Sequence, residues 1–189
     1  MAMTPSNMLA LATRAPDFQL PATDGSVYAL QDFAASRLLL TMFICNHCPF
    51  VQHIRAGLAQ LGREYPVSDL AIVAINSNDI AAYPADDMAH MREEVDAAGY
   101  VFPYLLDESQ RVAQAYDAAC TPDFFLFDAE RRLIYRGQFD DSRPGNDKPV
   151  TGADLRAAIT AALAGEPPRA EQKPSIGCNI KWRPGNAPA

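Results

Sequence analysis

An apolar run leads directly into a CxxC motif, which is followed by the pattern of an amphipathic helix. The run Leu38–Ile44 (LLLTMFI) is nearly continuous, as is typical of a parallel strand covered on both faces. Beyond the motif, apolar residues recur every three or four positions, namely Val51, Ile54, Leu58, Leu61 and Tyr65. The motif Cys45-Asn46-His47-Cys48 is therefore predicted to lie at a strand-to-helix junction.

The rest of the chain alternates strand and helix patterns. Its 189 residues, 49% of them hydrophobic, suit a single α/β domain with a sizeable core. The expected elements are a hairpin within 16–33 that turns at Thr23-Asp24-Gly25, a buried strand at 70–75, a helix from about 86 to 98 closed by Gly99, a short helix near 109–116, a hairpin of strands 124–127 and 133–135, and a last helix at 152–163.

The composition changes at Gly165. Five of the 15 prolines fall after it, so no regular element is expected there, and we divide the chain into a domain (1–164) and a Pro-rich tail (165–189). The tail nevertheless contains Ile176, Cys178 and the only tryptophan, Trp182, which a disordered segment has little use for. We expect the tail to pack on the domain, and participation of Cys178 in redox chemistry is the less favoured alternative.

The charge of the chain restricts its partners. A net charge of −7 argues against nucleic acid, because phosphate binding needs a basic surface. No apolar stretch reaches the length of a membrane span, and the N-terminus lacks the pattern of a secretory leader. These features predict a cytoplasmic protein with no membrane partner.

The CxxC motif predicts thiol–disulfide exchange. Amides and the dipole at a helix N-terminus stabilise a thiolate, so Cys45 is expected to have a lowered pKa and to attack. Cys48, one turn further on, can then resolve the mixed disulfide. Pro49 suits the first helical position, where no amide hydrogen is needed. The expected partners are a disulfide-containing protein or small thiol and an unidentified electron donor.

His47 lies between the two cysteines and can present positive charge to the Cys45 thiolate. A fall of about two pKa units changes the rate of attack little, because nucleophilicity falls with basicity. The same shift is about 2.7 kcal/mol, or roughly 60 mV toward a more oxidising couple. The position of His47 therefore predicts an effect on the reduction potential of the dithiol more than on the rate of attack by Cys45.

A CxxC can also be half of a zinc site, which normally needs a second Cys or His pair. Here Cys120 and Cys178 are isolated in the sequence, and only His53 is nearby. Redox chemistry is thus favoured over zinc, and neither a metal nor another cofactor is expected. Residues 76–79 (NSND), which follow a buried strand, can be either a binding loop or turn formers.

Several motifs occur in the order found in one known family. Ala15-Pro16-Asp17-Phe18-Gln19-Leu20 precedes the first hairpin, the CxxC ends an apolar strand, and Thr121-Pro122 precedes a Phe-rich strand. Over roughly residues 14–164 the chain resembles the redoxin branch of the thioredoxin-like superfamily, which contains alkyl hydroperoxide reductase and thiol-specific antioxidant proteins. Together, CNHCPFV and the terminal PSIGCNIKW resemble an uncharacterised bacterial subgroup.

This resemblance implies a thioredoxin-like fold, with a central mixed sheet flanked by helices, an N-terminal hairpin and an extended C-terminal tail. It also implies that Pro122 is a cis-proline beside the dithiol and that the backbone of Thr121 pairs with a bound substrate strand, as in β-augmentation. Cys120 can either approach the dithiol or be a small core residue.

The chain departs from ordinary thioredoxins at two points. Ile44 stands where thioredoxins usually have Trp, and no carboxylate occurs in residues 38–44. A general base for Cys48 is therefore unassigned. The motif is closer to the Cys-x-His-Cys of protein disulfide isomerases and DsbA-type oxidants, which puts a role as a general protein reductant in doubt.

Two other functions compete with disulfide exchange. Family thiol peroxidases carry a Thr and a Pro at set positions before the reactive cysteine, but Met42 and Leu38 occupy those positions before Cys45. The same pattern also fails before Cys48. A copper-binding metallochaperone of thioredoxin fold suits two soft thiolates, yet such proteins carry CxxxCP and a late histidine, whereas the last histidine here is His90.

Overall fold

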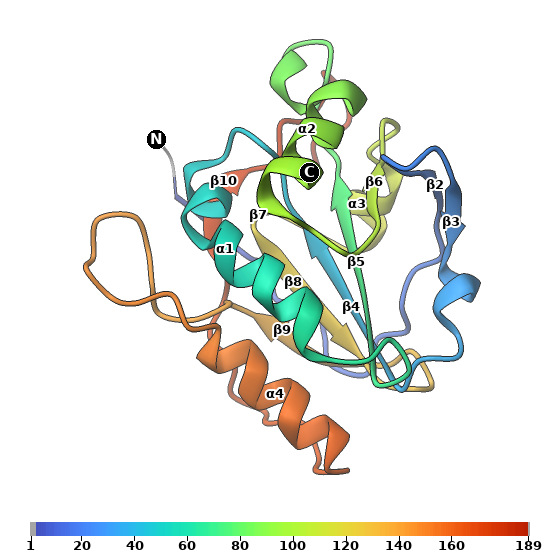
Figure 1. Cartoon of the computed structure of the whole chain (residues 1–189), viewed down its shortest axis with the longest axis vertical. Coiled ribbons are helices and arrows are strands. Elements are labelled where there is room, and N and C mark those ends of the chain that lie inside the picture. The colour runs from blue at the N-terminus through green and yellow to red at the C-terminus, as the bar shows by residue number, and fades with distance from the viewer. Residues whose placement is uncertain (1–2, 189) are drawn as a thin grey trace.

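A five-stranded mixed sheet forms the centre of the molecule (Figure 1), and the computed structural model describes residues 3–188. In spatial order its strands are β6 (Tyr104–Leu106), β5 (Leu70–Asn76), β4 (Leu38–Phe43), β8 (Asp123–Phe127) and β9 (Leu133–Gly137). β4, β5 and β6 run parallel, whereas β8 is antiparallel to both β4 and β9. The predicted thioredoxin-like α/β fold with a central mixed sheet is confirmed.

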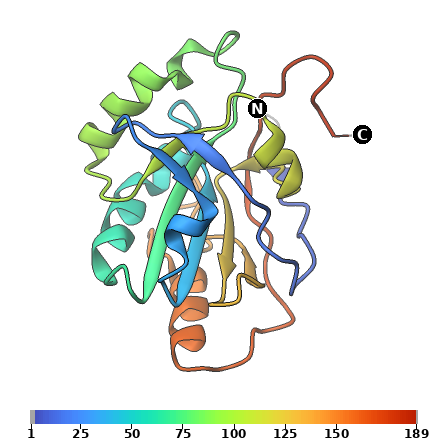
Figure 2. The same cartoon turned by 90° about the vertical axis from the view of Figure 1, so that its right-hand side faces the viewer.

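Helices cover both faces of this sheet. One face carries α1 (Pro49–Glu64), α2 (Met88–Ala98) and α4 (Ala153–Leu163), and the short α3 (Arg111–Ala115) lies on the other (Figure 2). The apolar run of β4 serves both cores because successive side chains alternate: Leu40 and Met42 face α1, while Leu39 and Phe43 face the opposite core. Within residues 3–188, no helix combines the length and the apolar character that crossing a membrane requires.

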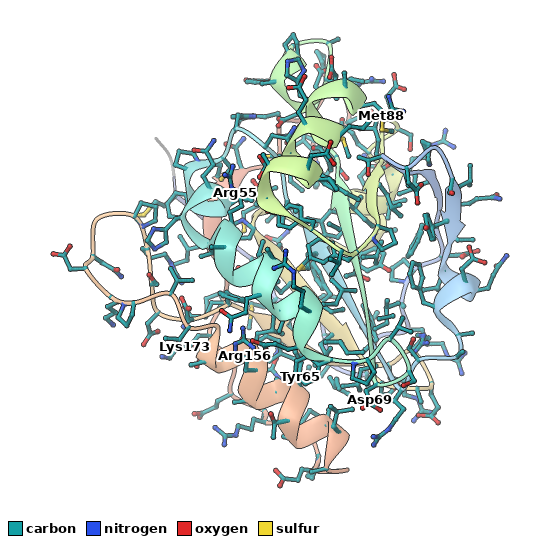
Figure 3. The ribbon with its side chains drawn as sticks, in the orientation of Figure 1. Arg55, Tyr65, Asp69, Met88, Arg156 and Lys173 are labelled. Atoms are coloured by element: carbon teal, nitrogen blue, oxygen red, sulfur yellow. The ribbon has the colours of Figure 1, made fainter. Side chains whose placement is uncertain are left out.

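Ion pairs join α1 to its two neighbouring helices, and Figure 3 labels the arginines of these pairs, Arg55 and Arg156. Arg55 of α1 lies 3.2 Å from the carboxylate of Glu94 in α2, and Arg156 of α4 pairs with Glu64 at the end of α1. These pairs are partly exposed, so each contributes little to stability. The docking of α1 rests mainly on its buried stripe, which includes Ile54 and Leu58.

Most of the locally patterned elements lie where the sequence predicts them. The first hairpin consists of β2 (Gln19–Pro21) and β3 (Val27–Ala29), followed by a 3-10 turn at Leu30–Phe33. Gly99 ends α2 in the left-handed conformation, with φ of 68°. The helix itself begins later than expected, at Met88, because Asp87 caps it and a separate 3-10 turn covers Pro84–Asp86.

The expectation that the tail contains no regular element is wrong. Strand β10 (Ile176–Asn179) lies between β1 (Thr4–Pro5) and β7 (Cys120–Thr121) in a second, three-stranded sheet. Figure 1 shows β10 close to β7 and to the start of α1. The strand depends on pairing with two distant segments rather than on local propensity, which the surrounding prolines obscure. The boundary between 1–164 and 165–189 remains a prediction.

Candidate redox site

The two cysteines of the CxxC occupy the loop between β4 and α1. β4 ends at Phe43, and α1 begins at Pro49, which takes the first helical position as predicted. Cys48 is the residue that caps the helix, so Cys45 precedes the helix by a short turn. Both side chains are enclosed, with 1% of Cys45 and none of Cys48 exposed to solvent.

Thr121, at the end of β7, contacts both sulfurs. Its hydroxyl Oγ1 lies 3.4 Å from Cys45 Sγ, and its carbonyl oxygen accepts a hydrogen bond of 3.1 Å from the Cys48 thiol. The peptide bond between Thr121 and Pro122 is cis, as the resemblance implies. The structure therefore brings four of the predicted site residues together, although they come from two distant parts of the chain.

Cys45 and Cys48 also interact with each other, and the pKa of each thiol depends on the other, so their titration is a property of the pair. The hydrogen bond from Cys45 lowers the pKa of Cys48. The same bond raises the pKa of Cys45, and burial and the negative charge of Asp86 raise it further. The expected lowering of the Cys45 pKa is therefore wrong: the lowered pKa belongs to Cys48, the residue at the helix terminus.

The contacts with Thr121, in contrast, favour a protonated Cys48 and a thiolate at Cys45. A thiol at Cys48 is needed to donate to the Thr121 carbonyl, and the Thr121 hydroxyl can then donate to a thiolate at Cys45. Both placements of the proton thus have hydrogen-bond partners in the site.

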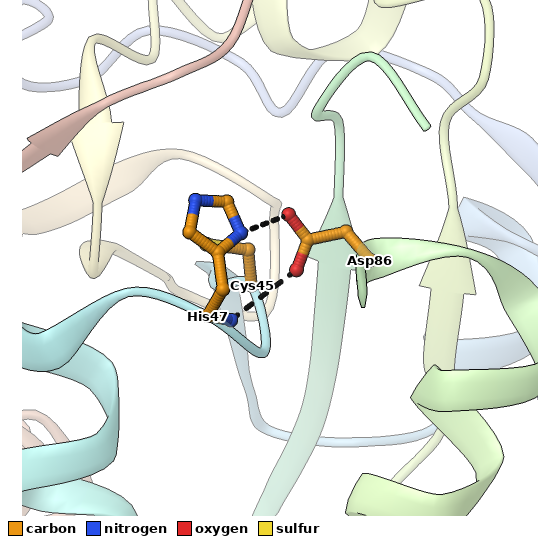
Figure 4. Close-up of side chains that lie close together, drawn as sticks. All are labelled: Cys45, His47 and Asp86. Atoms are coloured by element: carbon orange, nitrogen blue, oxygen red, sulfur yellow. Dashed lines mark hydrogen bonds and ion pairs between the residues drawn. The ribbon is translucent and has the colours of Figure 1, made fainter. Parts of the chain in front are cut away.

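A buried carboxylate, Asp86, organises the residues between the cysteines (Figure 4). Its Oδ2 lies 2.5 Å from the ring Nδ1 of His47, and its Oδ1 accepts the backbone N–H groups of Asn46 and His47 at 2.8 and 3.3 Å. Asp86 has no exposed surface. The carboxylate therefore positions the imidazole of His47 next to Cys45.

Asp86 is the functional residue that the sequence analysis missed. An aspartate at the start of a helix pattern is indistinguishable from an ordinary cap. The only signal was the polar segment 76–79, which we interpreted as either a binding loop or turn formers. Asn78 Nδ2 donates to Asp86 Oδ2 at 2.8 Å, and Asn76 Nδ2 donates to the Asp86 carbonyl at 2.7 Å, so these residues hold the carboxylate in place.

Tyr83 and Lys181 complete the outer surface of the site. The ring of Tyr83 stacks on His47 with centroids 5.5 Å apart and planes 6° apart. Lys181, from the C-terminal tail, places its ammonium 5.9 Å from the centre of the Tyr83 ring. The tail therefore contacts Tyr83, which stacks on the imidazole, and pairs with β7.

Cys45, His47 and Asp86 also carry donor atoms that bind metals, and within residues 3–188 one atom from each lies within 4.8 Å of the other two. The carboxylate oxygens already accept hydrogen bonds from Asn46, Asn78 and His47. A metal ion would have to replace the bond between His47 and Asp86. The donor set is thus suited to an ion but is already satisfied by internal hydrogen bonds.

The other two cysteines are placed differently. Cys120 is fully buried; its thiol lies 3.6 Å from the carbonyl of Pro122, and burial raises its pKa. Cys178 is 5% exposed and hydrogen-bonds to Cys48, and burial followed by the contact with Cys48 raises its pKa. No disulfide joins the described cysteines. Cys178, and not Cys120, is therefore the cysteine that contacts the CxxC pair.

The sheet, the junction of β4 with α1 and the adjacent cis-proline define a thioredoxin-like protein with a buried dithiol. Residues 10–155 match the Redoxin family model, and the chain belongs to that family, within the thioredoxin-like superfamily. No curated protein matches the chain.

Three solved structures illustrate the similarity. A hypothetical protein from Sinorhizobium meliloti 1021 is 57% identical over 96% of this chain and 100% of its own, with a TM-score of 0.94. An uncharacterized conserved protein from Geobacillus kaustophilus is 50% identical over 98% of both chains, with a TM-score of 0.95. A secreted Mycobacterium tuberculosis disulfide oxidoreductase homologous to E. coli DsbE is 16% identical over 76% of this chain and 95% of its own, with a TM-score of 0.60, and shows the shared fold.

Proposed function

We propose that this protein is a thiol–disulfide oxidoreductase in which Cys45 attacks and Cys48 resolves. The observation that carries the proposal is the contact of both cysteine sulfurs with Thr121, and the coupled titration of the two thiols supports it. Membership of the Redoxin family and the fold shared with a disulfide oxidoreductase support a redox function of this class.

The reaction begins with proton transfer within the pair. When the proton lies on Cys48, the Cys45 thiolate attacks one sulfur of a substrate disulfide and expels the other sulfur as a thiolate, which takes up a proton. Cys48 then loses its proton and attacks Cys45 Sγ, releasing the second substrate thiol. The substrate disulfide is thereby reduced, and the dithiol is oxidised to a Cys45–Cys48 disulfide.

The surroundings of Cys45 favour it as the attacking residue. Cys45 lies behind His47, whose side chain is 30% exposed, whereas Cys48 is enclosed by Cys45, Thr121 and Cys178. A substrate that displaces the imidazole therefore meets Cys45 first. We propose a disulfide-containing protein or a small disulfide as substrate, and an unidentified dithiol as the electron donor that reduces the Cys45–Cys48 disulfide.

Trapping tests this assignment. With oxidised glutathione as the probe, Cys48→Ala should accumulate a glutathione adduct at Cys45, because the resolving thiol is missing. Cys45→Ala should accumulate none, and Cys120→Ala serves as a matched control that turns over. Adducts at Cys48 in the Cys45→Ala variant, formed as fast as those at Cys45, would contradict the order of attack.

The reduction potential of the pair gives the direction of net transfer. Equilibration with glutathione followed by alkylation and mass spectrometry measures it. A value near about −270 mV supports a reductase, and a value well above about −200 mV supports an oxidant or isomerase.

Metal binding is a second candidate, favoured by the donor atoms of Cys45, His47 and Asp86. It predicts a stoichiometric Cu(I) complex that survives a competing chelator while the protein turns over no disulfide. Release of the ion to the chelator, together with disulfide turnover, eliminates this candidate.

A further inference from the structure

Strand β10 occupies the backbone edge at which the family resemblance leads us to expect a substrate strand. It runs antiparallel to β7, with Cys178 opposite Thr121 and Asn179 opposite Cys120. Beyond the strand, the N–H of Ile180 donates to the carbonyl of Ala119 at 3.1 Å. The chain therefore fills this edge with its own C-terminal segment.

Gly177 allows β10 to approach β7 unusually closely. A Cβ atom at this position would lie 2.0 Å from the carbonyl oxygen of Thr121 and 3.1 Å from the ring of Pro122. Any other residue would force the backbone of β10 away from β7, because neither of these groups can move aside easily. On the other side of Gly177, Ser175 Oγ donates to the Pro122 carbonyl at 2.8 Å.

This close approach brings a third sulfur to the dithiol. Cys178 lies opposite Thr121, whose carbonyl accepts a hydrogen bond of 3.1 Å from the Cys48 thiol. Contacts with Cys45 and with Cys178 both affect the pKa of Cys48, so Cys48 is the sulfur that the other two share. Cys178 is 5% exposed, and its position next to Cys48 is maintained by the strand pairing on both edges of β10. A buried thiol in contact with the resolving cysteine has a high effective concentration for exchange.

We propose that Cys178 is a third redox-active thiol, carried on a built-in substrate strand, and that it exchanges with the oxidised dithiol at Cys48. The Cys178 thiol loses its proton and attacks Cys48 Sγ of the Cys45–Cys48 disulfide. A Cys48–Cys178 disulfide forms, the Cys45–Cys48 bond breaks, and Cys45 leaves as a thiolate that takes up the proton. No net oxidation occurs, because the disulfide only changes partners.

The exchange has two consequences, and both rest on the proposed function of Cys45 and Cys48. It returns Cys45 to the thiol form while the protein remains oxidised. It also moves the disulfide onto β10, so a reductant must act on the tail strand. The tail is then part of the catalytic cycle and not only a cover.

Disulfide mapping tests the exchange. The wild-type protein is oxidised with one equivalent of oxidised glutathione per dithiol, blocked with an alkylating agent, digested without reduction and analysed by mass spectrometry. We expect a peptide pair joined through Cys48 and Cys178 in addition to the pair joined through Cys45 and Cys48. In Cys178→Ala, only the Cys45–Cys48 disulfide should form.

A second pair of variants tests the role of the strand without changing a thiol. Gly177→Ala should lower the yield of the Cys48–Cys178 disulfide by about tenfold or more, because displacement of β10 lowers the effective concentration of the Cys178 thiol beside Cys48. Asn179→Ala is the matched control: its side chain is exposed and it lies in the same strand, so it should retain the wild-type yield. Circular dichroism establishes that both variants are folded.

The outcomes separate the two proposals. If the wild-type protein turns over disulfides but forms only the Cys45–Cys48 bond, or joins Cys178 to Cys120, the inference about Cys178 is wrong and the proposed function stands. If it forms no Cys45–Cys48 disulfide and has no turnover, the proposed function fails as well. A Cys48–Cys178 bond at equal yield in Gly177→Ala and Asn179→Ala contradicts the role of β10.

Discussion

The ring Nδ1 of His47 lies 2.5 Å from Oδ2 of Asp86, a carboxylate with no exposed surface. Asp86 raises the pKa of Cys45 through its charge. A hydrogen bond from the imidazole withdraws part of that charge, so His47 acts on Cys45 through Asp86 as well as directly. The two residues therefore have opposite effects on the Cys45 thiol.

His47→Ala should slow the attack of Cys45 on oxidised glutathione at neutral pH. The unpaired Asp86 disfavours the thiolate, and a rise of one pKa unit lowers the thiolate fraction about tenfold. The more basic thiolate is about threefold more nucleophilic, so the expected net loss of rate is about threefold. The rate of adduct formation in the Cys48→Ala background measures this effect. His90→Ala is the matched control, because His90 forms a similar pair with Asp87 at 2.8 Å on the exposed surface. Equal losses in both variants would contradict a specific role for His47.

Asp86→Asn should shift the pH profile of Cys45 attack toward lower pH, opposite to the shift in His47→Ala. Removing the negative charge lowers the pKa of Cys45, and a more stable thiolate also makes the couple more oxidising. One hydrogen bond, to Asn78 or His47, is lost at a cost of about 1–3 kcal/mol.

The matched control for this charge is Asp87→Asn. It removes one charge at the neighbouring position, where Asn can still cap α2 through its side chain. Its pH profile should be that of the wild-type protein. If Asp86→Asn and His47→Ala shift the profile in the same direction, the assigned electrostatic roles are wrong.

Cys120→Ala should retain disulfide turnover within about twofold of the wild-type rate. Its thiol is buried and contacts the Pro122 carbonyl, not the hydrogen-bonded sulfurs of Cys45 and Cys48. The substitution removes a small buried group, for which a loss of about 1 kcal/mol in unfolding free energy is expected. Steady-state turnover and urea unfolding check both statements, and loss of turnover in a stable variant would place Cys120 in the cycle.

The sequence predicts the junction of β4 and α1 well, because the evidence for it is local. The apolar strand, the proline at the first helical position and the helical stripe all lie within one continuous segment. The cis bond before Pro122 came from family resemblance and not from any local pattern. The strand and the start of the helix are therefore recognisable in the chain itself, and the cis bond is not.

The rest depends on contacts between distant segments. Asp86 bonds to a histidine 39 positions away, and its sequence context suggests a helix cap. β10 becomes a strand because β1 and β7 pair with it, and Gly177 shows its importance only beside the Thr121 carbonyl. The coupled titration of Cys45 and Cys48 is likewise a property of the assembled pair. Pattern and spacing carry none of this information.

A second buried carboxylate, Asp123, gives a prediction about stability. It is fully buried, and burial raises its pKa to about 7, while hydrogen bonds from Ser6 and the Ala119 backbone lower it only in part. Its Oδ1 has no hydrogen-bond partner among the described residues. The native protein therefore keeps a proton here that the unfolded chain loses near pH 3.8.

The sign of the resulting pH dependence follows from proton binding. Between about pH 4 and pH 7 the native state binds more protons than the unfolded state, so the stability contributed by this site is greatest at low pH and falls as the pH rises. A shift of about three units corresponds to roughly 4 kcal/mol over this window. Ionised Asp123 therefore destabilises the native protein at neutral and alkaline pH.

Asp123→Asn should remove this dependence. The amide stays neutral at every pH and can retain a hydrogen bond from the Ala119 backbone, so the variant should gain stability relative to the wild-type protein as the pH is raised from about 5 to about 8. Urea unfolding at both pH values measures the difference. Asp96→Asn, at an exposed position in α2, is the matched control and should show no such gain. A parallel pH dependence in wild type and Asp123→Asn would mean that Asp123 is not protonated in the native state.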